Sequence, residues 1–445
     1  MNSETLSAKS VKLPNLMNCF VAYLCFTVFL CFFGPIHFNI RNPGIMILLL
    51  TAYHIALLLG YRWGTKKDVL KYPVAEEAEF TGNDAVKLNR LIIIGLAFDV
   101  LLLIIVCGTI DPAIVFDKIT EGLLNPSTRY NNAFSEAAAR GSNISTLIVT
   151  LGMPFTIMAL ILGVFYFPML RTETKLLVAL LYFVHICYCF TQGANEGIFD
   201  VAIYIGVAAF LRVQSNSVNR QRKHLKRKGN VIFVVAVCVI ACLALNFFTA
   251  NIIGRTQGNF AFGTLGENYY DRNAPINKYI PENLAVTFVY LSAYLCEGYY
   301  GMSLATTVEW VPNFGMGFSS FIRNNLSDLL GVDLFKNSYQ ARVGQQYNWG
   351  ALRNFHTAYT FWANDVSYIG VIFVMLLLGY VFARCYRASV LRQSKTAIIM
   401  MPLLVTMLFY LPANNKVFAQ PASMLLMVYL AGYQMLKYFS KKRYS

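Results

Sequence analysis

One histidine and a group of arginines stand out in a chain that is otherwise apolar. His356 lies directly before a long apolar run, and Arg255, Arg342 and Arg353 precede it in a long polar stretch. A neutral imidazole can accept a proton from a hydroxyl group, as a general base does. Guanidinium groups bind phosphate or pyrophosphate through two parallel hydrogen bonds. The catalytic candidates are therefore His356, as a candidate base, and Arg255, Arg342 and Arg129, as groups that favour an anionic ligand at the outer membrane surface.

Other residues of the polar regions could bind the remainder of a ligand. Aromatic rings with polar tips stack on sugar faces and also gather at membrane surfaces. Ionisable groups at membrane depth are costly and therefore suggest function. The substrate-binding candidates chosen on these grounds are Arg353, Arg323, Arg272, Tyr299, Tyr300, Trp310, Trp349, Asp365 and Glu297.

Each of these candidates also has a plainer explanation. An outer arginine can pair with an acid of its own loop, and an aromatic ring can anchor a helix at the membrane surface. Asp365 can complement the dipole at the start of a helix, and His356 can be a hydrogen-bonded anchor. Among the groups that could accept a proton, Glu297 or Asp365 could equally replace His356.

The composition indicates what kind of scaffold positions these residues. The 445 residues are 57% hydrophobic and 13% charged, whereas soluble domains carry about 25% charge. The net charge of +15 arises from Lys and Arg in short loops between apolar runs, which encodes membrane topology. Nucleic acid is therefore not an expected partner. The ten cysteines show no metal-binding spacing and no disulfide framework.

The apolar runs predict an all-α polytopic membrane protein with about ten transmembrane helices, since a helical span needs about 20 residues. Asp99 and Asp200 are acids within two of these runs. The expected spans cover residues 16–34, 43–61, 91–109, 144–167, 175–192, 197–211, 231–250, 360–383, 396–413 and 417–436.

Basic residues set the orientation of these spans. Because positive charge favours the cytoplasmic side, both termini are expected in the cytoplasm. The basic segments that carry this signal are 62–90, 171–175, 212–228, 384–395 and 437–443.

Residues 251–358 then form a large outer loop. Its apolar part, 284–305, would invert every later span if it crossed the membrane. Glu297 and an expected helix break at Gly298–Gly301 favour an interfacial or re-entrant helix instead. The outer loop would act as a lid over the site.

The chain therefore divides into three parts. Residues 1–250 form a seven-span bundle, with an outer loop at 110–143 and a basic cytoplasmic loop at 212–230. Residues 251–358 are the large outer loop, with short interfacial helices. Residues 359–445 hold three more spans and a basic cytoplasmic tail.

Motifs for several other chemistries are missing from the sequence. There is no HExxH, DxD, GxSxG or phosphate-binding GxxxxGK[ST] pattern. Metalloprotease, metal-bound nucleotide-sugar transferase, serine hydrolase and ATPase activities lose support, and no metal or cofactor is expected. The glycine-rich run 313–318 is expected to be a turn.

Three local patterns carry a resemblance to a known family. They are PSTRY at 126–130, EGYYGMSLA at 297–305 and HTAYTFWANDVSYIG at 356–370. Together with the layout of spans and the late outer loop, they resemble the oligosaccharide repeat-unit polymerases of bacterial surface polysaccharide synthesis, the Wzy-type or O-antigen polymerase family.

The resemblance implies a metal-independent glycosyltransferase at the outer face of a bacterial inner membrane. Its substrates would be two polyprenyl-pyrophosphate-linked oligosaccharides, one as donor and one as acceptor, and it would be surrounded by membrane lipids. A chain-length regulator and a flippase are the further partners that the resemblance suggests.

Two other functions remain open at this point. An O-antigen-type ligase would transfer finished glycan from the lipid carrier to a final acceptor. A lipid-linked oligosaccharide flippase or another transporter would need charged residues along a central cavity instead.

Overall fold

The computed structural model describes residues 13–66, 80–140, 144–193, 195–222, 242, 245–254, 268–350 and 354–443. The candidates Arg255 and Arg353 lie outside these residues. The α-helices are α1 (Leu16–Phe33), α2 (Pro43–Lys66), α3 (Gly82–Cys107), α4 (Pro112–Leu124), α5 (Pro126–Arg140), α6 (Ile144–Tyr166), α7 (Thr172–Gln192), α8 (Asn195–Arg222), α10 (Glu282–Ala305), α11 (Ser320–Leu330), α12 (Tyr339–Tyr347), α13 (Ala358–Leu391), α14 (Lys395–Tyr410), α15 (Lys416–Ala419) and α16 (Pro421–Arg443).

The remaining regular elements are short. An unlabelled helical stretch covers Leu245–Gly254, and two 3₁₀ helices, η1 (Phe167–Met169) and η2 (Pro275–Tyr279), follow α6 and β2. Strand β1 (Ile36–His37) pairs antiparallel with β2 (Tyr269–Tyr270). This small sheet joins the end of α1 to the segment that precedes α10.

The expected all-α architecture is found, and several helices suit a membrane. Among the described residues, six helices are long and apolar enough to cross one: α1, α2, α3, α6, α7 and α13. Exposed apolar side chains such as Leu48 and Phe373 cover their outer faces, as lipid-facing surfaces require. The other expected spans include the shorter apolar helix α14 and helices α8 and α16, whereas 231–250 lies mostly outside the described residues.

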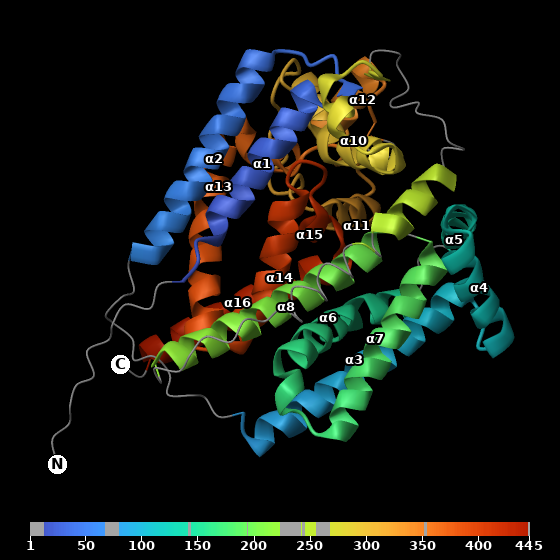
Figure 1. Ribbon diagram of the computed structural model, residues 1–445, viewed down its shortest axis with the longest axis vertical. Helices are drawn as coiled ribbons and strands as arrows, with labels where there is room; N and C mark the ends of the chain where they lie inside the picture. Colours follow the sequence, from blue (N-terminus) through green and yellow to red (C-terminus); the bar gives the residue numbers. More distant parts are fainter. Residues whose placement is uncertain are drawn as a thin grey trace.

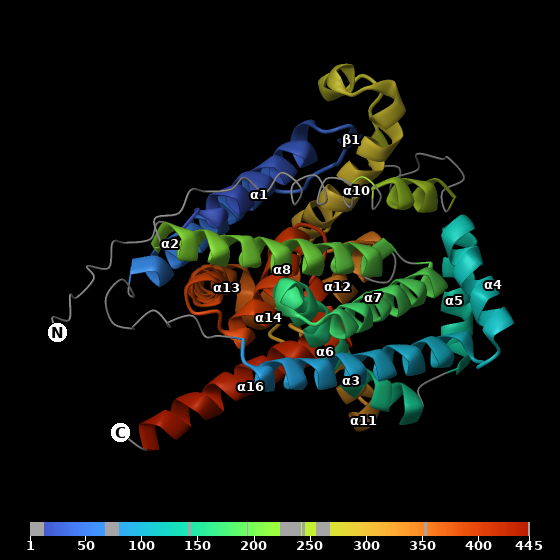
Figure 2. The same cartoon turned by 60° about the horizontal axis from the view of Figure 1, so that its bottom comes forward.

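The helices form two groups joined by a middle layer (Figure 1). In one group α1, α2 and α13 lie side by side. In the other, α3, α6 and α7 pack together, with α4 and α5 at one end. Helices α8, α14 and α16 lie between the groups, and Figure 2 shows α8 running across this layer. Helices α10 and α12 cover the end of the molecule where α1 meets β1.

Glycines allow α2 and α13 to lie unusually close. A Cβ atom added at Gly60 would lie 1.9 Å from the Leu376 carbonyl oxygen, and one at Gly379 would lie 2.1 Å from that of Leu57. Gly60 and Gly64 form a GxxxG pattern, which lets two helix backbones approach in a membrane. This crossing holds the helix that follows His356.

The apolar segment 284–305 is one continuous helix, and the expected break at Gly298–Gly301 is absent. Both residues lie within α10. A Cβ added at Gly298 would be 2.1 Å from the Pro412 carbonyl oxygen, and one at Gly301 would be 2.7 Å from that of Phe355. These glycines therefore serve close helix packing rather than chain reversal.

Helix α13 changes direction at Ser367, which has φ 61° and ψ 167°. A non-glycine residue in this region carries backbone strain of about 1–3 kcal/mol. The kink separates a short first piece of α13, directly after His356, from its long apolar piece. The short piece can therefore follow the segment before α13 and need not continue the line of the long piece.

Candidate functional site

The segment 354–357 lies against α10 and brings two sequence candidates to one place. His356 is 2% exposed, and a Cβ added at Gly301 would lie 3.1 Å from its Nδ1 atom. One turn earlier on α10, Glu297 accepts a hydrogen bond from the Asn354 side-chain amide at 3.4 Å. The structure therefore places Glu297 on α10 and His356 in the segment that packs against the next turn of that helix.

Neither ring nitrogen of the buried His356 imidazole makes a hydrogen bond of normal geometry among the described residues, although the Trp349 backbone lies close enough to favour the charged ring. Burial lowers the pKa of His356 to about 4, against a smaller opposing effect of the Trp349 backbone. The ring is therefore neutral at neutral pH. A buried polar ring without a partner is unfavourable, and such groups call for an explanation in the function of the site.

The pKa of the Glu297 carboxyl group is shifted upward, whereas that of His356 is shifted downward. Burial raises the pKa of Glu297 to about 7, although the Asn354 amide and the Phe355 backbone favour its charged form. Its side chain keeps partial solvent access. A carboxyl group that titrates near neutrality can accept or donate a proton at the working pH of a cell.

Two aromatic side chains, Tyr300 and Trp349, form a wall beside segment 354–357. Tyr300 of α10 meets Trp349 edge to face, with ring centroids 4.7 Å apart, and both residues are almost fully buried. The Trp349 indole N–H donates to the Phe355 carbonyl at 3.2 Å. Tyr299 points into the core, where its hydroxyl lies 2.9 Å from that of Thr27. These rings position the 354–357 segment instead of facing solvent.

Asn364 of α13 binds residues of the segment between α10 and α13, and it was missed as a candidate. Its side chain accepts from the Tyr339 backbone N–H at 2.7 Å and donates to Gln340 at 2.9 Å. Its carbonyl accepts from the Trp310 indole at 3.3 Å, while the Trp310 ring is 42% exposed. The contacts come from residues 24 to 54 positions away, so no local pattern could predict them.

Asp365 holds the glycine-rich run, which is a turn as expected. Its Oδ1 atom accepts from the backbone N–H groups of Gly315 at 2.8 Å and Gly317 at 3.1 Å. Its Oδ2 atom is buried without a hydrogen-bond partner among the described residues. Asp365 therefore anchors the loop, which leaves Glu297 as the better alternative to His356.

Two described arginines between α10 and α13, Arg342 and Arg323, each have an N–H group without a hydrogen-bond partner among the described residues. Arg342 donates to the backbone carbonyls of Glu309 and Asn337, yet its Nη2 atom has no partner among the described residues. Arg323 is 6% exposed, stacks over the Phe335 ring at 4.4 Å, and likewise has an unpartnered Nη1 atom. Both side chains thus keep a buried N–H group that could donate a hydrogen bond to an anion.

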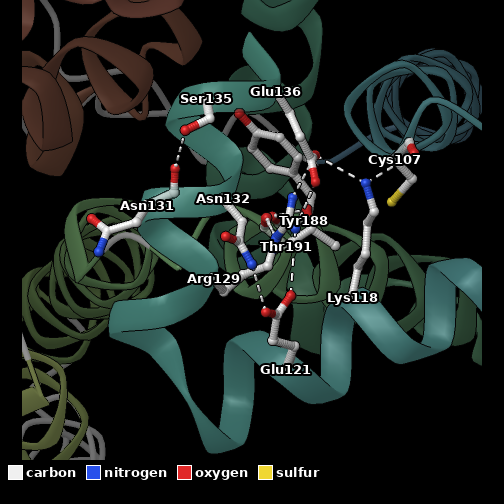
Figure 3. A network of polar contacts seen from close by, with 10 residues as sticks. All are labelled: Cys107, Lys118, Glu121, Arg129, Asn131, Asn132, Ser135, Glu136, Tyr188 and Thr191. Carbon is white, nitrogen blue, oxygen red and sulfur yellow. Dashed lines mark hydrogen bonds and ion pairs between the residues drawn. The ribbon is translucent and has the colours of Figure 1, made fainter. Parts of the chain in front are cut away.

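Arg129 has a different environment (Figure 3). Its guanidinium makes two bonds to Glu136, at 3.0 and 2.8 Å, a weaker one to Glu121 at 3.4 Å, and its Nε donates to the Thr191 carbonyl at 2.7 Å. Lys118 also pairs with Glu136 at 2.9 Å. Hydrogen bonding to Arg129 holds the pKa of Glu136 at about 2. Arg129 therefore pairs with acids of its own loop, which is the plainer of the two explanations given for it above. Its bond to Thr191 ties α5 to the end of α7.

A buried ion cluster at the start of α8 was not anticipated. Lys416, only 6% exposed, contacts Glu196 and lies 2.9 Å from Asp200. Burial opposes its charge, but the two carboxylates outweigh burial and raise the pKa of Lys416. Gln420 donates to Glu196 at 2.8 Å. The acids were visible in the sequence, whereas their cation lies some 220 positions away.

A second buried pair lies within the membrane helices. Asp99 of α3 is fully buried, and both of its carboxylate oxygens lie 3.1 Å from Nδ1 of His185 on α7. Pairing explains how an acid is tolerated at that depth.

Of the other outer candidates, Arg272 is exposed beside β2. Among the described residues, no cluster of histidine, cysteine and acidic side chains could hold a metal ion. Comparison of the chain with protein-family models, with curated proteins and with solved structures found no match.

Proposed function

We propose that this protein is a glycosyltransferase that polymerises polyprenyl-pyrophosphate-linked oligosaccharide repeat units at the outer face of a bacterial inner membrane. The observation that carries the proposal is that segment 354–357 packs on α10, with Glu297 bound to Asn354 and His356 against Gly301. The carboxyl group has a raised pKa, and the imidazole makes no hydrogen bond of normal geometry among the described residues. About ten spans and cytoplasmic termini belong to the same proposal.

In this reaction the hydroxyl of the acceptor glycan attacks the anomeric carbon of the donor. The bond between that carbon and the pyrophosphate oxygen breaks, and the pyrophosphate leaves on its lipid. The hydroxyl proton goes to Glu297, because a base that titrates near pH 7 is both ionised and basic enough at neutrality. His356, with a pKa of about 4, would be a much weaker proton acceptor.

His356 then faces the leaving group. The imidazole is neutral while the site is empty, since burial disfavours its charge. A pyrophosphate within about 4–6 Å would favour the imidazolium and supply the missing hydrogen-bond acceptor. Arg342 and Arg323 would donate hydrogen bonds from their unpartnered N–H groups to the same pyrophosphate. Arg255 and Arg353 are proposed to do the same.

The test uses purified protein with lipid-linked repeat units and follows chain length over pH. Wild-type turnover should rise through about pH 7 as Glu297 ionises. Glu297→Gln should lose that dependence together with about 10²–10⁴ in rate, while His356→Ala keeps the dependence at a lower rate. Glu309→Gln is the matched control, because Glu309 lies in the same segment with an exposed side chain.

If the Glu297→Gln variant lengthened glycan chains at the wild-type rate, Glu297 could not be the base. In the host, deletion should leave single repeat units on the lipid carrier or end product. Long chains that are never attached would indicate the ligase alternative instead.

A flippase remains a second candidate because of the buried charges away from this site. The Asp99–His185 pair within two long apolar helices is the kind of group that transporters use, and the buried Lys416 cluster adds charge outside the proposed site. Movement of lipid-linked oligosaccharide across vesicles without lengthening would favour that function over polymerisation.

A further inference from the structure

A cavity of about 430 Å³ lies at the end of α1, away from Glu297 and His356. Phe29, Phe32 and Phe33 form one wall, and Ile36 of β1 and the segment 271–279 form the others. Its volume is within the range of small-molecule sites, about 300–1,000 Å³. The lining is mainly apolar, so water gains little from filling it.

The apolar wall is continuous with the membrane-facing surface. Phe29 is 48% exposed and Phe33 is 65% exposed, and both lie on the last turns of a helix that is long and apolar enough to span a membrane. A hydrocarbon chain could therefore enter the cavity sideways from the bilayer without crossing water.

Two cations are sequence neighbours of lining residues on the other side of the cavity. Arg272 and Lys278 adjoin the lining residues Asp271 and Tyr279, and both cations are exposed. One oxygen of Asp271 is already engaged by the Asn273 backbone N–H at 2.9 Å. Two cations beside one partly engaged acid favour an anionic head group at the level of the membrane surface.

The cavity is linked to the proposed reaction site through the aromatic wall. Two residues after Ile36, Phe38 stacks on Tyr300 with ring centroids 6.3 Å apart, and Tyr300 contacts Trp349. Trp349 in turn bonds the Phe355 carbonyl next to His356. A lipid held in the cavity would thus lie on the far side of one layer of rings from the reacting groups.

We infer that the cavity binds the isoprenoid chain of the lipid-linked acceptor, whose own pyrophosphate does not react, with the exposed Arg272 and Lys278 available to its phosphates. The choice of an isoprenoid over an ordinary phospholipid rests on the proposed function. The cavity, the exposed phenylalanines on its wall and the exposed cations next to its lining residues are independent of that function.

The test is a binding experiment with purified full-length protein in detergent. Long-chain polyprenyl phosphate, the uncharged polyprenol of equal length and phosphatidylglycerol are titrated separately, and bound lipid is counted by native mass spectrometry. Wild-type protein should prefer polyprenyl phosphate. Joint replacement of Arg272 and Lys278 by alanine should remove the preference over polyprenol but leave polyprenol binding intact.

Phe29→Ala should weaken binding of both isoprenoids by about tenfold, since it removes part of an apolar wall. Phe26→Ala is the matched control, because Phe26 lies on the same helix, is equally exposed at 48%, and does not line the cavity. Ala274→Trp fills the cavity and gives a second, independent variant. Equal binding by Phe29→Ala and Phe26→Ala, or equal affinity for phosphatidylglycerol, would overturn the inference.

The binding result and the proposed function can fail separately. Selective isoprenoid binding by a protein that lengthens no glycan would refute the polymerase proposal and retain the lipid site. Lengthening that is unaffected by Phe29→Ala and Ala274→Trp, with unchanged lipid binding, would refute the lipid site alone.

Discussion

Replacing Glu297 by glutamine should change how the stability of the protein depends on pH. A group whose pKa is raised in the folded state stabilises that state below its unfolded pKa and loses this effect as pH rises through the folded pKa. For Glu297 the two values are 4.5 and about 7, so wild-type stability should lose this contribution between those pH values. Glutamine cannot ionise and should keep the contribution at pH 8.

The size of the effect follows from the shift. Each pKa unit corresponds to about 1.36 kcal/mol, which gives about 3 kcal/mol at most, and partial solvent access to the side chain reduces it to about 2 kcal/mol. His356 acts with the opposite sign. Its pKa falls from 6.5 to about 4, so its contribution is lost as pH decreases through that window.

The two groups therefore offset each other in the wild-type protein. Between about pH 4.5 and 6.5 the wild-type curve should be nearly flat with respect to these residues. In Glu297→Gln only His356 remains, so stability should rise with pH and then level off. The amide keeps the size of the carboxyl group and can still accept from Asn354.

Thermal unfolding of purified protein in detergent, at pH 4.5, 6 and 8, measures this difference. Glu309→Gln should follow the wild-type curve, since its side chain is exposed. Parallel pH curves for wild type and Glu297→Gln would show that Glu297 does not titrate near neutrality, and the assignment of the base would fail with it.

Three further substitutions test the scaffold by the same unfolding measurement. Arg129→Ala should lower the free energy of unfolding by about 3 kcal/mol, the low end for a buried ion pair, because its glutamates are about a third exposed. Lys416→Met should destabilise by a similar amount, because Glu196 and Asp200 lose their cation, and neutralising both acids as well should restore stability. Gly60→Leu should cost about 1–3 kcal/mol or more, since even its Cβ would overlap α13.

Each of these substitutions has a control in the same protein. Arg171→Ala and Lys395→Met change exposed cations, so they should alter stability by less than about 1 kcal/mol. Gly44→Leu lies on the same helix as Gly60, where an added Cβ meets nothing within 4 Å. If a control destabilised as much as its partner, the corresponding contact would not be the cause.

The candidate site was only partly accessible from the sequence. Residue type identified His356 and Glu297, because histidine and membrane-level acids are rare in such a chain. Their adjacency depends on Gly301, whose missing side chain lets segment 354–357 reach α10. The partners of Arg129, seven and eight positions along the chain, could be named as loop acids but not distinguished from a ligand without coordinates.

Apolar runs of sufficient length were enough to predict the helical class and the positions of six long apolar helices, such as α1 and α2, because a lipid environment requires about 20 apolar residues with internally bonded backbones. That requirement is local and can be read from composition. Tertiary structure alone decided that the Gly298–Gly301 glycines do not break α10, and that Lys416 neutralises two acids on a distant helix. Such outcomes depend on which surfaces meet, and contacts between residues hundreds of positions apart leave no periodic trace in one sequence.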